Sequence, residues 1–404
     1  MQQRKKLVII GGGPAGFFAA IHAAKAHPDW FILILEQGNR VLGKVKISGG
    51  GRCNVTHACF DTRELTQFYP RGQKELLAPF KLFACADTLH WFEERNVPLK
   101  TEQDGRVFPV TDDSQTIIDC LLNEAKKNQI EIRKNCKVFS ISHQQKFSIK
   151  TDREALEADV VIVACGSSSL IWETLKEMGH TVIPPVPSLF SFKTKNTLFR
   201  NLSGIAIPNC SIKTNADKVS VNGNVLITHE GISGPAILKL SSFSARTLAE
   251  KNYQFDCCIN WCNAKAEDCM ILLQEIKSAH SKKQIHNFAP YDFPARFWEN
   301  VLLENKIPHQ KLWADISKNE LQKLAQFLTN CTIQISGKST NKDEFVTAGG
   351  IKLSEVDFKT MQSKLIPGLY FAGEVLDIDG VTGGFNFQAC WTTGYIAGIM
   401  MNVE

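Results

Sequence analysis

A short apolar run that ends in glycines, near the start of the chain, restricts the fold more than any other feature. Residues 7–10 (LVII) lead into the sequence GGGPAG at 11–16, and an alanine-rich stretch follows over 14–27. A second apolar run at 31–35 (FILIL) ends on Glu36. The spacing predicts a strand, a helix and a second, parallel strand within about 30 residues, which is the length of a βαβ unit.

The glycines match the pattern G-x-G-x-x-G, and each has a physical role in holding a pyrophosphate. Gly11 permits a tight turn, Gly13 lets the backbone approach the phosphates, and Gly16 lets the helix pack against the strand. The start of the helix offers unpaired N–H groups and a partial positive charge. Glu36 follows Gly16 by 20 positions, where its carboxylate would accept hydrogen bonds from a ribose and repel a 2′-phosphate. The sequence therefore predicts a dinucleotide-binding domain.

The composition is that of an ordinary globular protein and argues against several classes. The 404 residues are 44% hydrophobic and 22% charged, with a net charge of +5, which allows an anionic ligand without requiring one. No stretch approaches the roughly 18 apolar residues of a membrane span, and glycines interrupt the N-terminal apolar run before it resembles a secretory signal. The thirteen cysteines have no paired spacing, so we expect reduced thiols in a cytoplasmic protein. A small-molecule substrate is expected, whereas a membrane or nucleic-acid partner is not.

Strands of the same buried type recur far apart in the chain. Residues 159–164 (DVVIVA) and 369–372 (LYFA) both run towards a glycine. The simplest arrangement is one α/β domain with a long insertion, which begins near the prolines at 184–187 and ends near Gly349 and Gly350. We divide the chain into a nucleotide-binding domain (1–188 and 346–404), an inserted β-rich domain (189–262 and 329–345) and an inserted helical domain (263–328).

Two observations argue against an NADPH-dependent disulfide reductase. Such an enzyme would carry a second G-x-G-x-x-G module, and none is found; the sequence GSSS at 166–169 is not one. Its redox cysteines would be spaced C-x4-C, whereas Cys53 and Cys59 are spaced C-x5-C. A disulfide reductase is therefore disfavoured, although a thiol role for Cys53 stays open.

Several motifs resemble those of known flavoproteins. The glycine motif with Glu36, the strand VVIVACG at 160–166 and the segment GLYFAGE at 368–374 are similar to the FAD site of glutathione-reductase-type flavoproteins. Three further stretches are more specific: GKVKISGGGRCNVT at 43–56, THEGISGP at 228–235 and GEVLDIDGVTGGFNFQA at 373–389. Together they resemble the BaiN-like family of FAD-binding proteins, often labelled the aminoacetone oxidase family, over residues 7–400.

The resemblance implies a Rossmann-like α/β domain that binds FAD, interrupted by a β-barrel-like piece and a helical piece, and an oxidoreductase activity without a fixed substrate. It places the ribityl chain near Glu374, with Asp377 as the second candidate; turn chemistry beside Gly380 is an equal alternative for Asp377. A helix that begins near residues 382–386 would direct its N-terminus at the pyrimidine edge of the flavin, where negative charge arises on reduction. The residues expected to contact non-covalently bound FAD are Gly11, Gly13, Pro14, Ala15, Gly16, Glu36, Gln37, Lys44, Ser48, Gly50, Gly51, Arg52, Cys53, Asn54, Val138, Ala164, Cys165, Gly166, Gly373, Glu374, Asp377, Gly384, Asn386, Phe387 and Gln388.

The loop after the second strand carries most of the candidate catalytic residues. In related flavoproteins this part of the chain runs along the cofactor, so the glycines at 49–51 would lie against the isoalloxazine ring. Arg52 would offset negative charge on flavin or substrate, and Asn54 would bond a ring carbonyl. Cys53 is either a redox thiolate or, as we favour, a small buried residue; a cysteinyl link to the flavin is a further alternative. His229 is the one residue of its motif able to move protons near neutral pH, with a structural role as the favoured alternative.

The insertion contains two further patterns. The spacing C-C-x3-C-x6-C of Cys257, Cys258, Cys262 and Cys269 matches no standard pair of zinc ligands, so we expect core cysteines and no metal. The S-x-x-E sequence at 317–320 predicts a capping box at the start of a helix.

These observations predict a FAD-dependent oxidoreductase that transfers hydride between bound flavin and an unidentified small molecule or NAD(P)H. Because there is no second dinucleotide motif, NAD(P)H would bind only transiently. One alternative is an RNA-acting flavoprotein, such as a tRNA-modifying enzyme, in which the lysine-bearing helical insertion would bind the RNA. The other is a non-enzymatic redox sensor that uses Cys53. The substrate, the electron donor and acceptor, and the oligomeric state stay open.

Overall fold

The computed structural model describes residues 4–339 and 346–401. The chain divides into two compact units, one built from residues 1–185 and 347–404 and the other from 186–346. We call them unit 1 and unit 2. The insertion predicted from the sequence begins and ends within three residues of this division.

A seven-stranded sheet forms the centre of unit 1, in the order β20-β21-β22-β10-β1-β2-β6. The five strands from β22 to β6 are parallel, and β21 and β20 continue the sheet in antiparallel sense. The four strands predicted from the sequence are the neighbours β2, β1, β10 and β22, which confirms the α/β fold. The strands are β1 (Lys6–Ile10), β2 (Phe31–Leu35), β6 (Glu131–Arg133), β10 (Val160–Val163), β20 (Val356–Asp357), β21 (Gln362–Ser363) and β22 (Leu369–Phe371).

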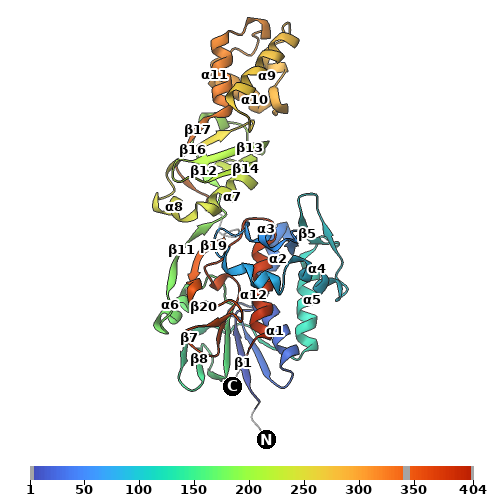
Figure 1. Cartoon of the computed structure of the whole chain (residues 1–404), viewed down its shortest axis with the longest axis vertical. Helices are drawn as coiled ribbons and strands as arrows, with labels where there is room; N and C mark the ends of the chain where they lie inside the picture. The colour runs from blue at the N-terminus through green and yellow to red at the C-terminus, as the bar shows by residue number, and fades with distance from the viewer. Residues whose placement is uncertain (1–3, 340–345, 402–404) are drawn as a thin grey trace. The chain divides into compact units, whose positions relative to one another are not determined.

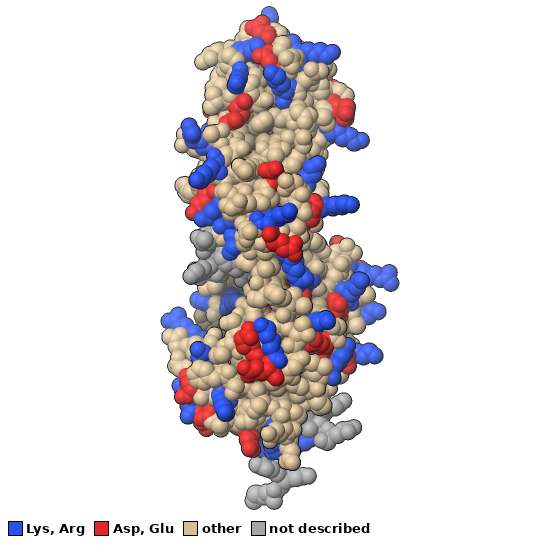
Figure 2. All heavy atoms as spheres, turned by 90° about the vertical axis from the view of Figure 1, so that its left-hand side faces the viewer, with Lys and Arg blue, Asp and Glu red and all other residues tan. Residues whose placement is uncertain are grey.

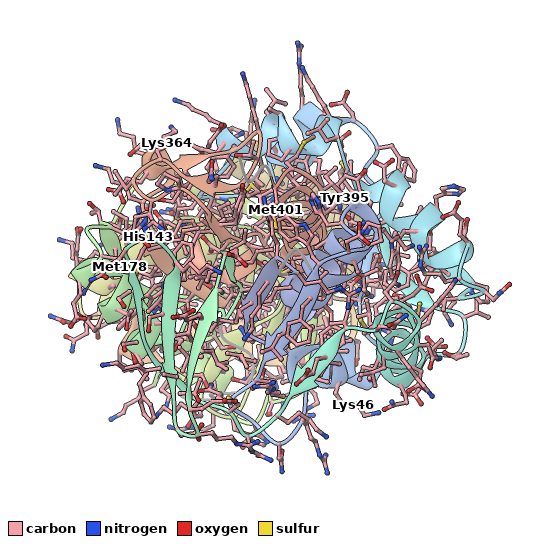
Figure 3. All side chains as sticks on the ribbon, turned by 90° about the horizontal axis from the view of Figure 1, so that it is seen from below. Lys46, His143, Met178, Lys364, Tyr395 and Met401 are labelled. Carbon is pink, nitrogen blue, oxygen red and sulfur yellow. The ribbon has the colours of Figure 1, made fainter. Side chains whose placement is uncertain are left out.

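Two helices, α1 (Pro14–Ala26) and α12 (Phe385–Ile399), pack side by side in unit 1 (Figure 1). A Cβ atom on Gly394 would lie 2.7 Å from the carbonyl oxygen of Ala15, and one on Gly398 would lie 2.6 Å from that of Ala19. Glycine is therefore required at both positions of α12, as expected for close helix packing. Towards the end of α12, the ring centroid of Tyr395 (labelled in Figure 3) lies 4.7 Å from that of His22 in α1.

Smaller elements that sequence reasoning did not predict complete unit 1. Two three-stranded antiparallel sheets, β3-β5-β4 and β7-β8-β9, follow β2 and β6, and β11 pairs with β19. The strands are β3 (Thr56–His57), β4 (Leu99–Thr101), β5 (Arg106–Pro109), β7 (Val138–His143), β8 (Phe147–Thr151), β9 (Ala155–Ala158), β11 (Val182–Ser188) and β19 (Val346–Ile351). The helices are α2 (Gly43–Ile47), α3 (Thr62–Thr66), α4 (Cys85–Glu93), α5 (Ser114–Lys127) and α6 (Ser169–Glu177).

Unit 2 combines a curled sheet with helices. The sheet order is β17-β16-β13-β14-β15-β12-β18. Because β18 follows β17 after one residue and Ser336 N–H donates to the carbonyl of Lys193 in β12, the sheet closes on itself like a barrel. Its strands are β12 (Phe192–Lys193), β13 (Ala206–Thr214), β14 (Ser220–Ile227), β15 (Gly231–Ser233), β16 (Phe255–Asn260), β17 (Cys331–Ile335) and β18 (Gly337–Lys338).

The helices of unit 2 fall into two groups. The first pair, α7 (Pro235–Phe243) and α8 (Ala245–Glu250), comes between β15 and β16 in the order of the chain. The others are α9 (Ala266–Ala279), α10 (Ala295–Glu304) and α11 (Lys318–Thr329), and they form the predicted helical part. At the start of α11 the Ser317 hydroxyl accepts from Glu320 N–H while the Glu320 carboxylate accepts from Ser317 N–H, which confirms the capping box. Across residues 4–339 and 346–401, no helix has the length and apolar character needed to cross a membrane.

Candidate functional site

Unit 1 brings its glycine-rich turns together at one edge of the parallel sheet. The carboxyl ends of β1, β2, β10 and β22 share this edge and lead into Gly11, Glu36, Ala164 and Ala372. Ligands of open α/β sheets bind outside the carboxyl ends of the strands. The predicted binding residues come mainly from these four ends and from the segments that follow them.

The start of α1 has the geometry of a phosphate cradle. Within the described chain no side chain caps this helix; its N-cap is Gly13, and a Cβ atom there would meet nothing within 4 Å. Gly11 has a φ of +114°, and a Cβ on it would lie 2.5 Å from the Ala164 carbonyl oxygen. Gly11 is thus required by the packing of β1 on β10, while Gly13 leaves open space in front of the helix N–H groups.

The Glu36 carboxylate is held by two backbone N–H groups. Its Oε2 accepts from Gly12 N–H at 2.9 Å, and its Oε1 accepts from Gly38 N–H at 2.7 Å. These bonds fix the carboxylate at the end of β2, beside the turn into α1. It keeps lone pairs for ribose hydroxyls, since each carboxylate oxygen can accept more than one hydrogen bond.

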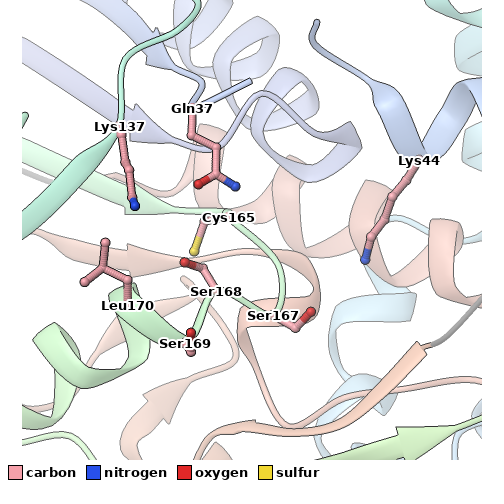
Figure 4. Close-up of a pocket in the computed structure, with 8 residues that line it drawn as sticks. All are labelled: Gln37, Lys44, Lys137, Cys165, Ser167, Ser168, Ser169 and Leu170. Carbon is pink, nitrogen blue, oxygen red and sulfur yellow. The ribbon is translucent and has the colours of Figure 1, made fainter. Parts of the chain in front are cut away.

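A cavity of about 400 Å³ lies beside this carboxylate, and Figure 4 shows the residues that line it. Six residues predicted to bind FAD line this cavity or a smaller adjoining one: Gly11, Glu36, Gln37, Lys44, Val138 and Cys165. Sequence reasoning missed five lining residues, Lys137, Ser167, Ser168, Ser169 and Leu170. A usable signal existed for the last four, because they directly follow β10 at the binding edge of the sheet.

Lys44 and Glu374 meet on the same side of the site. They form an ion pair between α2 and the short helix η10 (Gly373–Val375). A Cβ atom on Gly166 would lie 3.7 Å from Glu374 Oε2 and 3.9 Å from Lys44 Nζ. Three predicted residues from separate segments therefore converge. Ser48 instead turns towards its own segment, and its hydroxyl donates to the Val45 carbonyl at 2.9 Å.

The second glycine run presents bare backbone. Gly49, Gly50 and Gly51 have φ values of +57°, +69° and +88°, a left-handed conformation that strongly favours glycine. A Cβ atom on Gly50 or Gly51 would meet nothing within 4 Å. The run can thus accept a flat ligand against its backbone, as the sequence suggested.

The two residues after these glycines, Arg52 and Cys53, have surroundings that bear on their predicted roles. Arg52 was expected to offset charge on flavin or substrate, but its Nη1 lies 2.7 Å from Glu102 Oε1 and its guanidinium stacks 3.9 Å from the Phe108 ring centroid. The Cys53 side chain is fully buried, which agrees with the favoured interpretation of it as a small buried residue, and burial raises the pKa of the thiol to about 12; its predicted contact with the cofactor stays a prediction. A redox thiolate or a cysteinyl link at Cys53 is therefore not supported by the geometry.

The start of α12 is held by hydrogen bonds to the turn that precedes it. The helix begins at the N-cap Gly384, and no side chain in the described residues caps it. The Asn386 amide accepts from Gly380 N–H at 2.8 Å and donates to the Gly380 carbonyl at 2.9 Å. Phe387 stacks on the ring of Trp391, with centroids 5.8 Å apart.

Gln388 was predicted to contact the cofactor, and in the structure its amide is bonded to three hydroxyl groups instead. It is fully buried, where Oε1 accepts from the hydroxyls of Thr56 at 2.6 Å and Thr88 at 2.9 Å, while Nε2 donates to Thr392 at 3.1 Å. Its hydrogen bonds connect the first turn of α12 to β3 and α4.

The structure also places the candidates Asp377 and His229, and it gives a partner for Asp379, which was not a candidate. Asp379, two residues after Asp377, is fully buried and makes a bidentate ion pair with Arg71. Asp377 is 8% exposed. His229 is exposed in unit 2, between β14 and β15. Over the described ranges, no group of three or more His, Cys, Asp or Glu side chains is arranged to hold a metal ion.

The arrangement fits an extended dinucleotide. It offers an uncapped helix start with open space before it, a fixed carboxylate for a ribose, a polar cavity beside that carboxylate, a strip of bare glycine backbone and a second uncapped helix start. FAD has the matching parts, with an adenosine, a pyrophosphate and a flavin ring that gains negative charge on reduction.

Comparison with known proteins agrees with this geometry. Residues 5–400 match the family described as HI0933-like protein Rossmann domain. A ribosomal RNA dihydrouridine synthase of Escherichia coli (strain K12) is 27% identical over 406 residues, which cover 97% of both chains. A 3-dehydro-bile acid delta(4,6)-reductase of Clostridium scindens is 27% identical over 423 residues, covering 97% of this chain and 98% of the other. A solved structure of a 3-ketosteroid-delta4-(5alpha)-dehydrogenase from Rhodococcus jostii RHA1 shares the fold, with a TM-score of 0.50, 12% identity and 98% coverage of each chain.

The chain belongs to the HI0933-like Rossmann family, which confirms the BaiN-like resemblance of its motifs. It is a flavin-dependent oxidoreductase with a Rossmann-type FAD-binding domain.

Proposed function

We propose that the enzyme saturates a carbon–carbon double bond conjugated to a carbonyl, in a uracil base of ribosomal RNA, with NAD(P)H as the electron donor. The observation that carries the proposal is the pair of relatives that align along nearly the whole chain. One is named for making dihydrouridine and the other for reducing a bile acid at delta(4,6). Both names describe the same change of bonding, the addition of two hydrogens across an enone-like double bond.

The distribution of charge favours RNA over a steroid. Unit 2, residues 186–346, contains 19 Lys and Arg against 14 Asp and Glu, a net charge of +5. The rest of the chain has 27 of each, so the whole net charge of the protein resides in unit 2. Basic side chains project from unit 2 over much of the face in Figure 2, interspersed with acidic ones. An excess of positive charge on one unit suits a polyanion such as RNA better than a bile acid, which carries a single carboxylate.

The same count changes which part of unit 2 we expect to bind RNA. The helical part, 263–328, has nine basic and eight acidic residues, so most of the excess lies in the β-rich part of unit 2. The RNA-acting function, an alternative in the sequence analysis, thereby takes precedence over a small-molecule substrate in this proposal.

Bound FAD, once reduced by NAD(P)H, would supply the hydride that one carbon of the double bond receives. The chain's residues hold the adenosine end through Glu36 and the start of α1, and keep the backbone of Gly50 and Gly51 open to a flat ring. The uncapped start of α12 stabilises negative charge that develops near it. The balance consumes one NAD(P)H and one proton for each double bond saturated.

The test is a product analysis of the FAD-loaded enzyme under anaerobic conditions. Ribosomal RNA from cells that lack the enzyme is incubated with the protein and NADH or NADPH, digested to nucleosides and analysed by mass spectrometry. A parallel reaction contains a 3-oxo-4,6-diene steroid. We expect dihydrouridine in the RNA reaction and unchanged steroid in the other. Reduction of the steroid alone would refute the RNA substrate, and no reduction of either would refute the proposed bond change.

A further inference from the structure

We infer that His57 and Asn54 are positioning residues that lock a single peptide bond, between Gly383 and Gly384, at the start of α12. The inference concerns the flavin end of unit 1 and goes beyond the proposed function, because it holds for any substrate that the flavin reduces.

Both polar groups of this peptide are bonded to side chains from the segment around β3. His57 Nδ1 donates to the Gly383 carbonyl at 3.0 Å. We assign the Asn54 amide orientation from its neighbours, because only one of the two orientations lets the nitrogen donate to the carbonyls of Thr56 at 2.9 Å and Val107 at 3.2 Å. In that orientation its oxygen accepts from Gly384 N–H at 3.0 Å. The carbonyl and the N–H of this one peptide are therefore each held by a different side chain.

The peptide needs such restraint because both of its residues are glycines in unusual conformations. The φ values are +128° at Gly383 and +96° at Gly384. A Cβ atom on Gly384 would lie 2.8 Å from the Cα of Thr56, and one on Gly383 would lie 2.8 Å from the Phe385 ring. Larger residues are thus excluded by contact, and a glycine pair has little intrinsic barrier to rotation of the peptide between them.

The His57 side chain is itself fixed. Its ring stacks on Phe385 with centroids 4.6 Å apart, and Phe385 stacks on Phe68 at 4.2 Å. The carbonyl acceptor requires the proton on Nδ1, and burial lowers the pKa of the imidazole, which favours the neutral ring. His57 is therefore a rigid donor rather than a mobile acid.

The consequence is electrostatic. The peptide directly precedes the uncapped first turn of α12. Rotation of the Gly383–Gly384 peptide would reverse its dipole at the end of the helix that stabilises negative charge. Loss of either restraint should lower the reduction potential of bound FAD, because the reduced, more negative flavin would lose stabilisation.

The experiment compares three variants of the FAD-loaded, full-length protein. His57→Phe keeps the aromatic stacking and removes the donor, His57→Asn restores a donor at the position of Nδ1, and Asn54→Ala removes the acceptor. His90→Phe is the matched control, since His90 lies on α4 with a side chain 74% exposed. The readouts are the midpoint potential of the flavin, the FAD dissociation constant and the thermal unfolding temperature.

We expect a more negative potential and about fivefold weaker FAD binding for His57→Phe, as loss of about one hydrogen bond predicts, and a similar change for Asn54→Ala. We expect wild-type values for His57→Asn and His90→Phe. The inference is overturned if His57→Phe unfolds at a lower temperature but keeps the wild-type potential, or if His57→Asn shifts the potential as much as His57→Phe. If His57→Phe does not fold, an unchanged potential in Asn54→Ala overturns it.

Discussion

Arg71 and Asp379 form a buried ion pair whose disruption can be predicted in magnitude. The two side chains are 9% and 0% exposed, and they bridge two segments 308 residues apart in the sequence. Asp379 precedes the glycine turn into α12, and the backbones of the two residues also form an isolated antiparallel bridge. The ion pair thus connects the segment after α3 to the segment that leads into α12, at the flavin end of the site.

Replacing Arg71 by methionine keeps most of the side-chain volume but removes the charge that faces Asp379. Removing one partner of a buried ion pair costs about 3–5 kcal/mol, because the remaining charge stays in a poorly solvated place. The double variant Arg71→Met with Asp379→Asn also removes the buried negative charge. It should lose only about 1–3 kcal/mol, the cost of an imperfectly bonded polar group.

Urea unfolding of the FAD-saturated protein measures both losses, with flavin fluorescence reporting the release of FAD from unit 1. FAD is kept at one excess concentration, because a ligand of the native state raises apparent stability by mass action. Lys176→Met is the control; it breaks the exposed pair of Lys176 with Glu173 on α6 and should cost no more than about 0.5 kcal/mol. A loss below about 1 kcal/mol for Arg71→Met, or a double variant no more stable than the single one, would refute this reasoning.

Three further predictions concern single side chains. Gly13→Val should fold normally, since a Cβ there meets nothing within 4 Å, yet lose FAD because its side chain fills the cradle; circular dichroism and FAD titration test this, and full FAD occupancy would contradict it. Burial lowers the pKa of His22 from 6.5 to about 3, so the unfolded chain takes up a proton that the folded one excludes, and stability falls as the pH drops below 6.5. Between pH 7 and about 4.5 the wild type should lose about 2–3 kcal/mol more than His22→Leu in urea titrations, and parallel losses would argue against it. Cys53→Ala should leave the rate of flavin reduction by NAD(P)H within about twofold of the wild type in stopped-flow traces, because the thiol is buried with a pKa of about 12; abolished reduction would revive a redox role.

Local patterns were sufficient for the nucleotide end of the site. The spacing from Gly11 to Glu36 places both on one sheet edge once two parallel strands are assumed, and the structure has this geometry. The one-turn spacing of Gly394 and Gly398 puts them on one face of α12, and both are in close contact with α1 in the structure. Such features depend on residues near each other in the sequence, where periodicity and turn chemistry are decisive.

Long-range partners could not be read from the sequence. Arg52 and Gln388 were expected to face the cofactor because of their motifs, yet they bond to Glu102 and to Thr56 and Thr88. Nothing in a motif indicates which of many carboxylates or hydroxyls the fold will bring within 3 Å. The lining residues at 167–170 are a different case, since they follow a predicted strand and the strand-end rule would have found them.

The most direct measurement of the central claim follows flavin reoxidation under anaerobic conditions. The FAD-loaded enzyme is reduced with dithionite, so that no assumption about the donor is needed, and is then mixed with ribosomal RNA from cells lacking the enzyme. The account predicts that the flavin absorbance returns with this RNA and does not return with the same RNA already treated with the enzyme. A flavin that stays reduced in the presence of the RNA, but is reoxidised by a 3-oxo-4,6-diene steroid, would contradict it.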